Sequence, residues 1–342
     1  METVFVHQHS RMSWAGARSL TLALSLPLAV GAQSPADTSS HTTRFVNVAP
    51  NVRLETVDWG GRGRPVVLLA GAGNTAHIFD QLAPKLTSDY HVYGITRRGF
   101  GNSTITTSGF LSDSLADDVV AVIDSLGIRR PVLIGHSIAG QELSSIGSRH
   151  PEKVAGLVYL DAGAQFAFYD SAETHVGLTL RDASRKLTLL ADPGVAMTVA
   201  QRAAMIDELL ASSLPLLERD LRVYHRALAT APNQSAVVPA PQRDSIRRAL
   251  AMGTQKYTKI NGPVLAIFAH PPETPPAMAV DSASRARADS LARAALGPHI
   301  DNFERGVPQA RVVRIPHANH YVFRSNEAEV VREIRAFIGR LP

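Results

Sequence analysis

The chain has 342 residues, of which 45% are hydrophobic and 19% charged, a composition typical of a globular protein and not of a disordered one. Its formal net charge is +5, but the basic residues are scattered without a dense run or interleaved aromatic residues, so we expect no nucleic-acid partner. The absence of cysteine excludes disulfides, thiolate nucleophiles and cysteine-ligated metals.

Residues 1–32 have the pattern of a secretory signal peptide. Arginines precede an apolar stretch at residues 20–30, and small residues follow it. This stretch is about a dozen residues long, too short to span a bilayer comfortably. We therefore predict an exported protein, periplasmic or secreted, with no stable membrane insertion after signal removal. A disordered tail or a short anchor is the alternative, and Met12 is an alternative start. Residues 33–42 are predicted to be a flexible lead-in.

Strand-like and helix-like segments alternate from residue 43 onward. Residues 43–48 and 52–58 are predicted to form the two strands of an opening hairpin. Further strands are predicted at residues 65–69, 90–95, 131–134, 154–160, 263–269 and 311–315, of which 65–69 and 131–134 are continuous apolar runs. Helical periodicity predicts helices at residues 78–86, 113–126, 141–149 and 326–340. This alternation predicts an α/β fold with a mostly parallel sheet covered on both faces.

The helix at 113–126 has the clearest pattern. Its apolar residues recur every three or four positions, at Leu115, Val119, Val122, Ile123 and Leu126. Ser112 or Asp113 is expected to cap its start, and Gly127 to end it.

About 100 residues separate the strand that ends at residue 160 from the next one, at residue 263, and they show little strand character. Helical runs occur at residues 199–210, 215–229 and 242–252. We predict a helical lid, residues 163–260, inserted into a core formed by residues 43–162 and 261–342. A second domain unrelated to the functional site is the alternative.

A serine turn at residues 135–140, Gly-His-Ser-Ile-Ala-Gly, lies between an apolar strand and a helix. A serine at a sharp strand-to-helix turn projects its hydroxyl out of the sheet, and small neighbours are needed because the two backbones approach closely. Ala139 stands where the strict G-x-S-x-G pattern has glycine, and alanine is small enough to fit. The turn therefore predicts a hydrolase with Ser137 as its nucleophile; a turn with a capping serine is the alternative.

Four stretches together resemble the motifs of the α/β-hydrolase fold family, over roughly residues 43–342. Residues 68–73 are similar to the oxyanion loop, and residues 95–103 to the Asp-x-Arg-Gly-x-Gly-x-Ser segment. The serine turn is the third stretch, and residues 316–321 are similar to the Gly-His segment before the last helix. Ala70, Thr96 and Asn319 depart from the family pattern. A serine nucleophile disfavours the dehalogenases and epoxide hydrolases of the family, which use a carboxylate.

The resemblance implies a Ser-His-acid triad. It makes His320 the general base, with His317 as the alternative. The family often carries its acid after the strand at 263–269, where Glu273 lies one residue beyond the expected position. Some members place the acid after the preceding strand, where Asp161 follows. We predict Asp161 as the acid and keep Glu273 as the alternative; a helix cap is the alternative role for Asp161.

The elbow pattern also implies an oxyanion hole made by the backbone N–H groups of Ala72 and Ile138. Gly71, His136 and Phe166 are predicted to line the substrate site, and His136 also to pack beside the turn. No metal site is expected, because His317 and His320 lack carboxylates at ligand spacing.

The sequence thus predicts a serine hydrolase that cleaves a small-molecule carboxylic ester through an acyl-enzyme, without a cofactor. A lactonase, an amidase or peptidase, and a cofactor-free perhydrolase remain alternatives on the same fold, because the lid selects the substrate. A non-catalytic binding protein is the alternative from another class.

Overall fold

The computed structural model describes residues 39–163, 167–229, 245–276 and 280–342. The predicted signal peptide, Phe166 and the start of the predicted helix at 242–252 lie outside the described residues. None of the described helices combines the length and the hydropathy that crossing a membrane requires.

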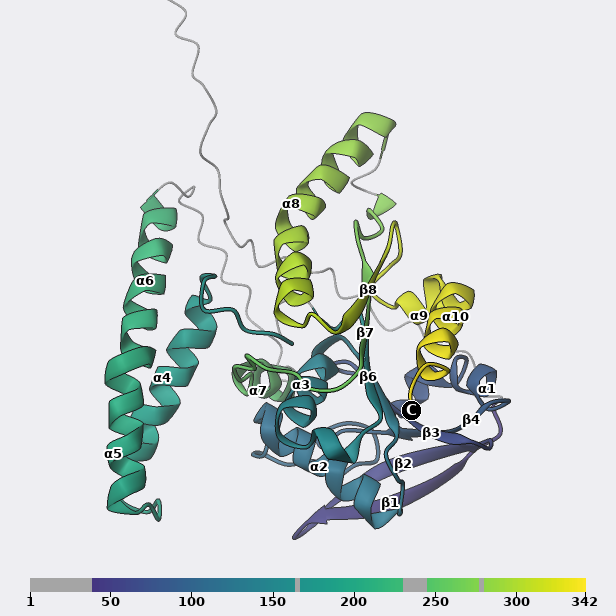
Figure 1. Ribbon diagram of the computed structural model, residues 1–342, viewed down its shortest axis with the longest axis horizontal. Helices are drawn as coiled ribbons and strands as arrows, with labels where there is room; N and C mark the ends of the chain where they lie inside the picture. Colours follow the sequence, from purple (N-terminus) through teal and green to yellow (C-terminus); the bar gives the residue numbers. More distant parts are fainter. Residues whose placement is uncertain (1–38, 164–166, 230–244, 277–279) are drawn as a thin grey trace, which may run out of the picture. The chain divides into compact units, whose positions relative to one another are not determined.

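The described residues form an eight-stranded sheet in the order β1-β2-β4-β3-β5-β6-β7-β8 (Figure 1). The strands are β1 (Thr42–Ala49), β2 (Val52–Gly60), β3 (Arg64–Leu69), β4 (Tyr90–Ile95), β5 (Val132–His136), β6 (Gly156–Leu160), β7 (Val264–Ala269) and β8 (Ala310–Ile315). The β1–β2 and β2–β4 pairs are antiparallel, and every other pair is parallel. The predicted mostly parallel sheet is therefore confirmed, and the carboxyl ends of β3 and β5 to β8 meet at one edge.

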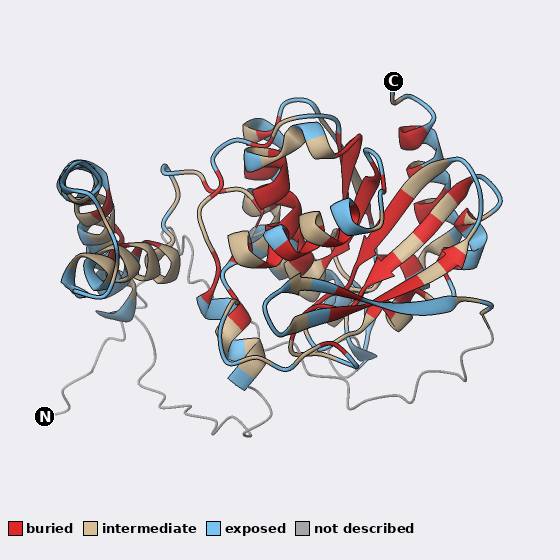
Figure 2. Cartoon of the chain, turned by 90° about the horizontal axis from the view of Figure 1, so that it is seen from below, coloured by how far each residue is buried: buried red, intermediate tan, exposed pale blue. Residues whose placement is uncertain are grey.

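The strands β5, β6 and β7 are buried on both faces, which explains the continuous apolar runs in their sequence, whereas β1 at the edge of the sheet is mostly exposed. Alternate residues of β3 point to opposite sides: Val66 and Leu68 belong to one core, Val67 and Leu69 to the other. The first core includes residues of α1 (Ala83–Leu86), α9 (Val322–Ser325) and α10 (Glu327–Ile338). The second includes residues of α2 (Ser112–Ser125), α3 (Gly140–Arg149) and α8 (Ser282–Gly306). Figure 2 shows these buried residues in red, concentrated in the strands and the helix faces that cover them.

Two local predictions about helices were wrong. The expected helix at 78–86 is divided into a 3₁₀ turn, Ala76–Phe79, and the short helix α1. Ser112 does not cap α2 but is its first helical residue; Leu111 precedes it without a capping bond, and the Ser112 hydroxyl instead donates to Gln141. Gly127 does follow the end of α2 as predicted, with a φ of +63° that glycine adopts at little cost.

The segment between β6 and β7 contains α4 (Val176–Ala191), α5 (Val199–Glu208), a π-helical turn (Leu209–Ser213), α6 (Leu214–Ala229) and α7 (Ser245–Met252). Its helical character agrees with the prediction, although α4 was not foreseen. Arg181 of α4 donates to the Thr254 hydroxyl at 2.8 Å, and Lys256 pairs with Asp182 at 3.0 Å. Leu250 of α7 packs with Phe110 and Leu115 of the core.

Candidate active site

Ser137 occupies a tight turn between β5 and α3. Its φ of +57° lies in the left-handed region, which is sterically unfavourable for a residue with a Cβ. Such strain persists only where the surrounding structure enforces it, and it concentrates at functional sites. The turn leaves the Ser137 side chain half-buried, at the edge where the parallel strands end.

Gly71 allows the loop after β3 to approach this turn. A Cβ on Gly71 would lie 2.8 Å from His136 Nδ1 and 3.1 Å from Ser137 Cβ. No larger residue fits without displacing these side chains, so glycine is needed here because the loop passes close to the side chains of the serine turn. The structure thus places Gly71 beside Ser137, where the sequence predicted a substrate-site residue.

His320 bridges Ser137 and Asp161. Its Nε2 lies 2.9 Å from Ser137 Oγ, and its Nδ1 lies 2.7 Å from Asp161 Oδ2. The carboxylate can only accept, so Nδ1 carries the proton and Nε2 accepts the hydrogen bond that the serine hydroxyl donates. Asp161 lies 159 positions and Ser137 lies 183 positions before His320 in the sequence, and the edge of the sheet brings the three residues together.

Asp161 is held by the end of the neighbouring strand. Its Oδ1 accepts from the N–H of Ala269 at 3.1 Å, and its own N–H donates to the Ile267 carbonyl at 2.7 Å. Its φ of +46° turns the side chain from the end of β6 toward His320. Each carboxylate oxygen therefore has a separate partner, and the bond from Ala269 to Oδ1 orients Oδ2 toward His320.

The alternative residues lie apart from this arrangement. His317 is 54% exposed, and its Nε2 lies 3.9 Å from Asp289. Glu273 donates its backbone N–H to the Ala318 carbonyl, and in the described part of the chain its side chain makes no hydrogen bond or ion pair with His320. Across the described ranges, no group of three or more His, Asp or Glu residues is placed to hold a metal ion.

His136 supports His320 from behind. Its ring is 1% exposed, and its Nε2–H donates to the His320 carbonyl at 2.9 Å. The expected substrate contact of His136 is therefore corrected: the enclosed ring presents no surface to a ligand, and packing is the role that the geometry supports. Burial, with a smaller contribution from His320, lowers the pKa of His136 to about 3, so the ring is neutral.

This buried histidine predicts a pH dependence of stability. Between its ordinary pKa of 6.5 and its folded value of about 3, only the unfolded chain binds a proton at this site. The free energy of unfolding should then fall by about 1.4 kcal/mol per pH unit below pH 6.5, and be independent of this group above it. From pH 7 to 5, urea denaturation of the wild type should show a loss about 2 kcal/mol larger than that of His136→Gln. Equal losses in the two proteins would refute this assignment.

Asn319 and Tyr321, on either side of His320, were not foreseen as parts of the site. The Asn319 side chain accepts from the Tyr321 N–H at 2.8 Å, which closes a tight turn around His320. The Tyr321 ring lies 4.8 Å from the His136 ring, and its hydroxyl accepts from Asn74 at 3.2 Å. Asn319, which departs from the family pattern, thus stabilises the turn that carries His320. This role could have been predicted from the sequence, because asparagine side chains often accept a hydrogen bond from the backbone two residues later.

Ile138 directly follows Ser137, and Ala72 directly follows Gly71, where a Cβ would lie 3.1 Å from Ser137 Cβ. Ile138 is the second residue of the 3₁₀ turn that follows β5, where N–H groups have no partner within the turn. In the described residues the Ala72 N–H likewise donates no hydrogen bond. Both residues pack against the same small apolar cluster as Leu250 of α7. Two unsatisfied donors beside a hydroxyl provide what an oxyanion hole needs, and this role stays a prediction.

A model described as the "Alpha/beta hydrolase family" matches residues 66–333 of the chain. A bifunctional esterase/perhydrolase of Acinetobacter calcoaceticus is 34% identical over 121 residues, which cover 34% of this chain and 44% of that protein. A non-heme chloroperoxidase of Streptomyces lividans is 38% identical over 108 residues, which cover 31% and 39%. The chain thus spans less than half the length of the curated relatives it matches.

Solved structures resemble the chain over most of its length. A bromoperoxidase from Bacillus anthracis has a TM-score of 0.55 at 18% identity, covering 87% of this chain and 100% of that one. A thermophilic esterase from Thermogutta terrifontis has a TM-score of 0.54 at 18% identity, covering 88% and 98%. At these identities the structural likeness establishes the fold alone.

Proposed function

The chain belongs to the alpha/beta hydrolase family, and we propose that it is a serine hydrolase that cleaves a carboxylic ester through an acyl-enzyme intermediate. One observation carries the proposal: the continuous hydrogen bonding from Ser137 Oγ through His320 to Asp161. In this proposal Ser137 is the nucleophile, His320 the general base and Asp161 the orienting acid.

The proposed reaction proceeds in two halves. Ser137 Oγ attacks the ester carbonyl carbon while its proton passes to His320 Nε2, and Asp161 stabilises the imidazolium. The N–H groups of Ala72 and Ile138 bind the oxyanion until the alcohol leaves with the proton from His320. Water then gives its proton to His320 and attacks the acyl-enzyme, which releases the acid and returns the proton to Ser137.

We further propose that residues 163–260 act as a lid that forms part of the substrate site. Leu250 of α7 belongs to the apolar cluster that includes Ala72 and Ile138. A Cβ on Gly99 would lie 3.1 Å from Ile246 of α7, so this helix lies close to the motif segment after β4. Apolar side chains from the insert beside the proposed oxyanion donors favour a substrate with an apolar acyl or alcohol group.

Perhydrolysis, in which peroxide replaces water in the second half, is the second candidate. It is favoured by the names of relatives: an esterase/perhydrolase and several non-heme haloperoxidases match the chain. The same three side chains serve both reactions, so the triad geometry does not separate them.

A panel of substrates tests the proposal. We expect turnover of para-nitrophenyl esters with a preferred acyl length, compared with lactones, amides, and acetate plus hydrogen peroxide. A serine-directed phosphonate should modify Ser137 stoichiometrically in the wild type. If the folded protein shows no turnover and no labelling, the proposal is contradicted and a non-catalytic binding protein is favoured.

A further inference from the structure

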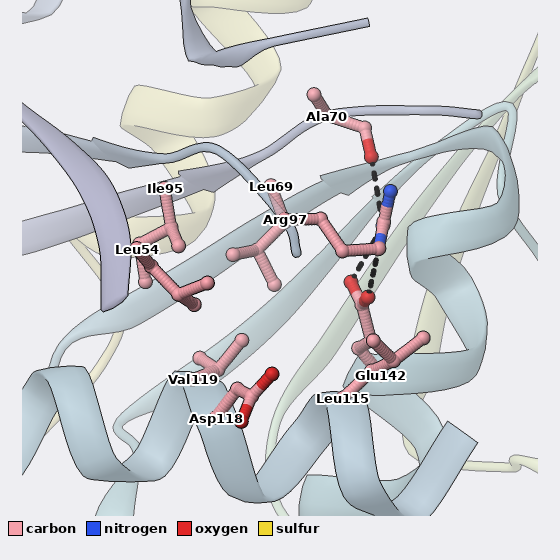
Figure 3. A pocket seen from close by; sticks show the side chains of 9 residues that line it. All are labelled: Leu54, Leu69, Ala70, Ile95, Arg97, Leu115, Asp118, Val119 and Glu142. Atoms are coloured by element: carbon pink, nitrogen blue, oxygen red, sulfur yellow. Dashed lines mark hydrogen bonds and ion pairs between the residues drawn. The ribbon is translucent and has the colours of Figure 1, made fainter. Parts of the chain in front are cut away.

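Arg97 and Glu142 form a buried ion pair that no step of the proposed reaction uses. Arg97 follows β4, and Glu142 lies in the first turn of α3. Arg97 Nε donates to Glu142 Oε1 at 2.5 Å, and its Nη2 donates to Oε2 at 2.9 Å (Figure 3). The same Nη2 donates to the Ala70 carbonyl at 2.9 Å. The guanidinium therefore contacts two segments at once.

These two segments carry the two proposed oxyanion donors. Ala70 directly precedes Gly71 and Ala72 in the loop after β3, and Glu142 is four residues after Ile138. We propose that Arg97, oriented by Glu142, positions the oxyanion loop against the serine turn. This inference rests on the proposed function. A planar guanidinium suits the task, because its fork of donors fixes direction as well as distance.

Thr96, the residue before Arg97, holds the other end of the same loop. Its hydroxyl accepts from the Ala76 N–H at 3.0 Å and donates to Glu55 Oε2 at 2.8 Å. The segment from residue 70 to 76 is thus attached at both ends to consecutive residues after β4. This double attachment fixes the loop between its ends, where the Ala72 N–H lies.

The location of the pair excludes direct contact with a substrate. The side chains of Arg97 and Glu142 are 6% and 4% exposed. The cavity that they line has a volume of about 10 Å³, which is room for about one water molecule. Arg97 and Glu142 are therefore positioning residues, which act through the loop and the helix that they join.

Burial alone does not explain the pair. Replacing a buried ion pair by apolar side chains of similar volume is often neutral or stabilising. Such side chains fill the same space but have no donor for the Ala70 carbonyl. The distinguishing property of Arg97 is thus its hydrogen bond to the loop, and an experiment can remove this bond while the packing is kept.

A neighbouring ion pair provides a matched control. Arg98 Nε donates to Asp118 Oδ2 at 2.7 Å, and its Nη2 donates to Oδ1 at 2.6 Å. Both side chains are nearly as buried as those of the first pair, at 9% and 6% exposed. Asp118 lies on α2, so this pair attaches a different helix and has no hydrogen bond to the described oxyanion loop.

The experiment compares Arg97→Met/Glu142→Met with Arg98→Met/Asp118→Leu, using full-length protein and a para-nitrophenyl ester. Losing one oxyanion donor costs about 10²–10³ in kcat, so a displaced donor should lower kcat by roughly 10- to 100-fold. KM should change by less than about 3-fold, because the donor acts mainly in the transition state. The control should keep kcat within about 3-fold of the wild type. Wild-type kcat in a folded Arg97→Met/Glu142→Met protein, or an equal loss in the control, overturns the proposal.

Two further measurements keep the test decisive. If the double variant does not fold, Arg97→Lys keeps the charge but not the fork, and it should lower kcat in the same way; unchanged kcat overturns the proposal. If the wild type itself hydrolyses no ester, the proposed function fails, and hydrogen exchange at the Asn74 and Ala76 amides remains as the readout, because these amides donate to the Gly71 carbonyl and to the Thr96 hydroxyl. Exchange should be at least about 10-fold faster in the double variant than in the control. Equal exchange overturns the positioning role.

Discussion

Ser137→Ala is expected to lower kcat for a para-nitrophenyl ester by at least ~10³-fold. When residues of a triad act as a unit, removing one of them abolishes most of the rate enhancement that the whole triad provides. The Ser137 hydroxyl is the group that lies 2.9 Å from His320 Nε2. Alanine has the same backbone restriction as serine, so a φ of +57° is no more strained in the variant. The melting temperature should therefore be unchanged while turnover disappears.

Ser148→Ala is the matched control for this substitution. Ser148 lies on α3, the helix that follows the turn, and its hydroxyl donates to the Lys259 carbonyl, away from His320. We expect its kcat within about 2-fold of the wild type, as for most changes outside the reacting groups. If Ser137→Ala keeps near-wild-type turnover, or the phosphonate modifies a different serine, Ser137 is not the nucleophile.

The central strands could be predicted from the sequence because their signal is local. The run at 90–95 coincides with β4, and the run at 65–69 differs from β3 by one residue. A strand covered on both faces needs an uninterrupted apolar run, which residues 65–69 display; residues 90–95 include His91 and are buried at alternate positions over most of their length. The four motif stretches, through their resemblance to the α/β-hydrolase family, also predicted this fold, which the family match confirms.

Two long helices were missed because their sequences lack the expected signals. The first half of α8 is mostly exposed and rich in alanine and arginine, so it has no apolar stripe, and Pro298 lies inside the helix. Only the start of α8 had a recognisable sequence pattern, because Asp281 and Ser284 form a capping box there. Helix α4 begins after His175 with no side-chain cap at all.

The triad acid could not be fixed from the sequence, because two parallel strands end side by side. Asp161 follows β6 and Glu273 comes after β7, so both are near the edge that carries His320. What separates them is the φ of +46° at Asp161 and the hydrogen bond from the Ala269 N–H, which a linear pattern does not contain. The pairing of Arg97 with Glu142, 45 residues apart, was hidden for the same reason.

Asp161→Asn is expected to lower kcat by roughly 10⁴-fold, the effect of reversing the histidine tautomer in a serine triad. The Ala269 N–H donates to Oδ1 of Asp161, so the amide oxygen of an asparagine would occupy this position. Its NH₂ group would then face His320 Nδ1, where Oδ2 now accepts. His320 must then carry its proton on Nε2, and this nitrogen can no longer accept the proton of Ser137.

Glu273→Gln separates this role from a general loss of negative charge near the site. It removes the charge of the competing carboxylate but has no described bond to His320 to break, so kcat should stay within about 3-fold of the wild type. Steady-state rates are measured for both variants, and their circular-dichroism spectra are compared with that of the wild type to establish that each is folded. A 10⁴-fold loss confined to Glu273→Gln would transfer the acid to β7, and His320 would then need a different orientation from the one described.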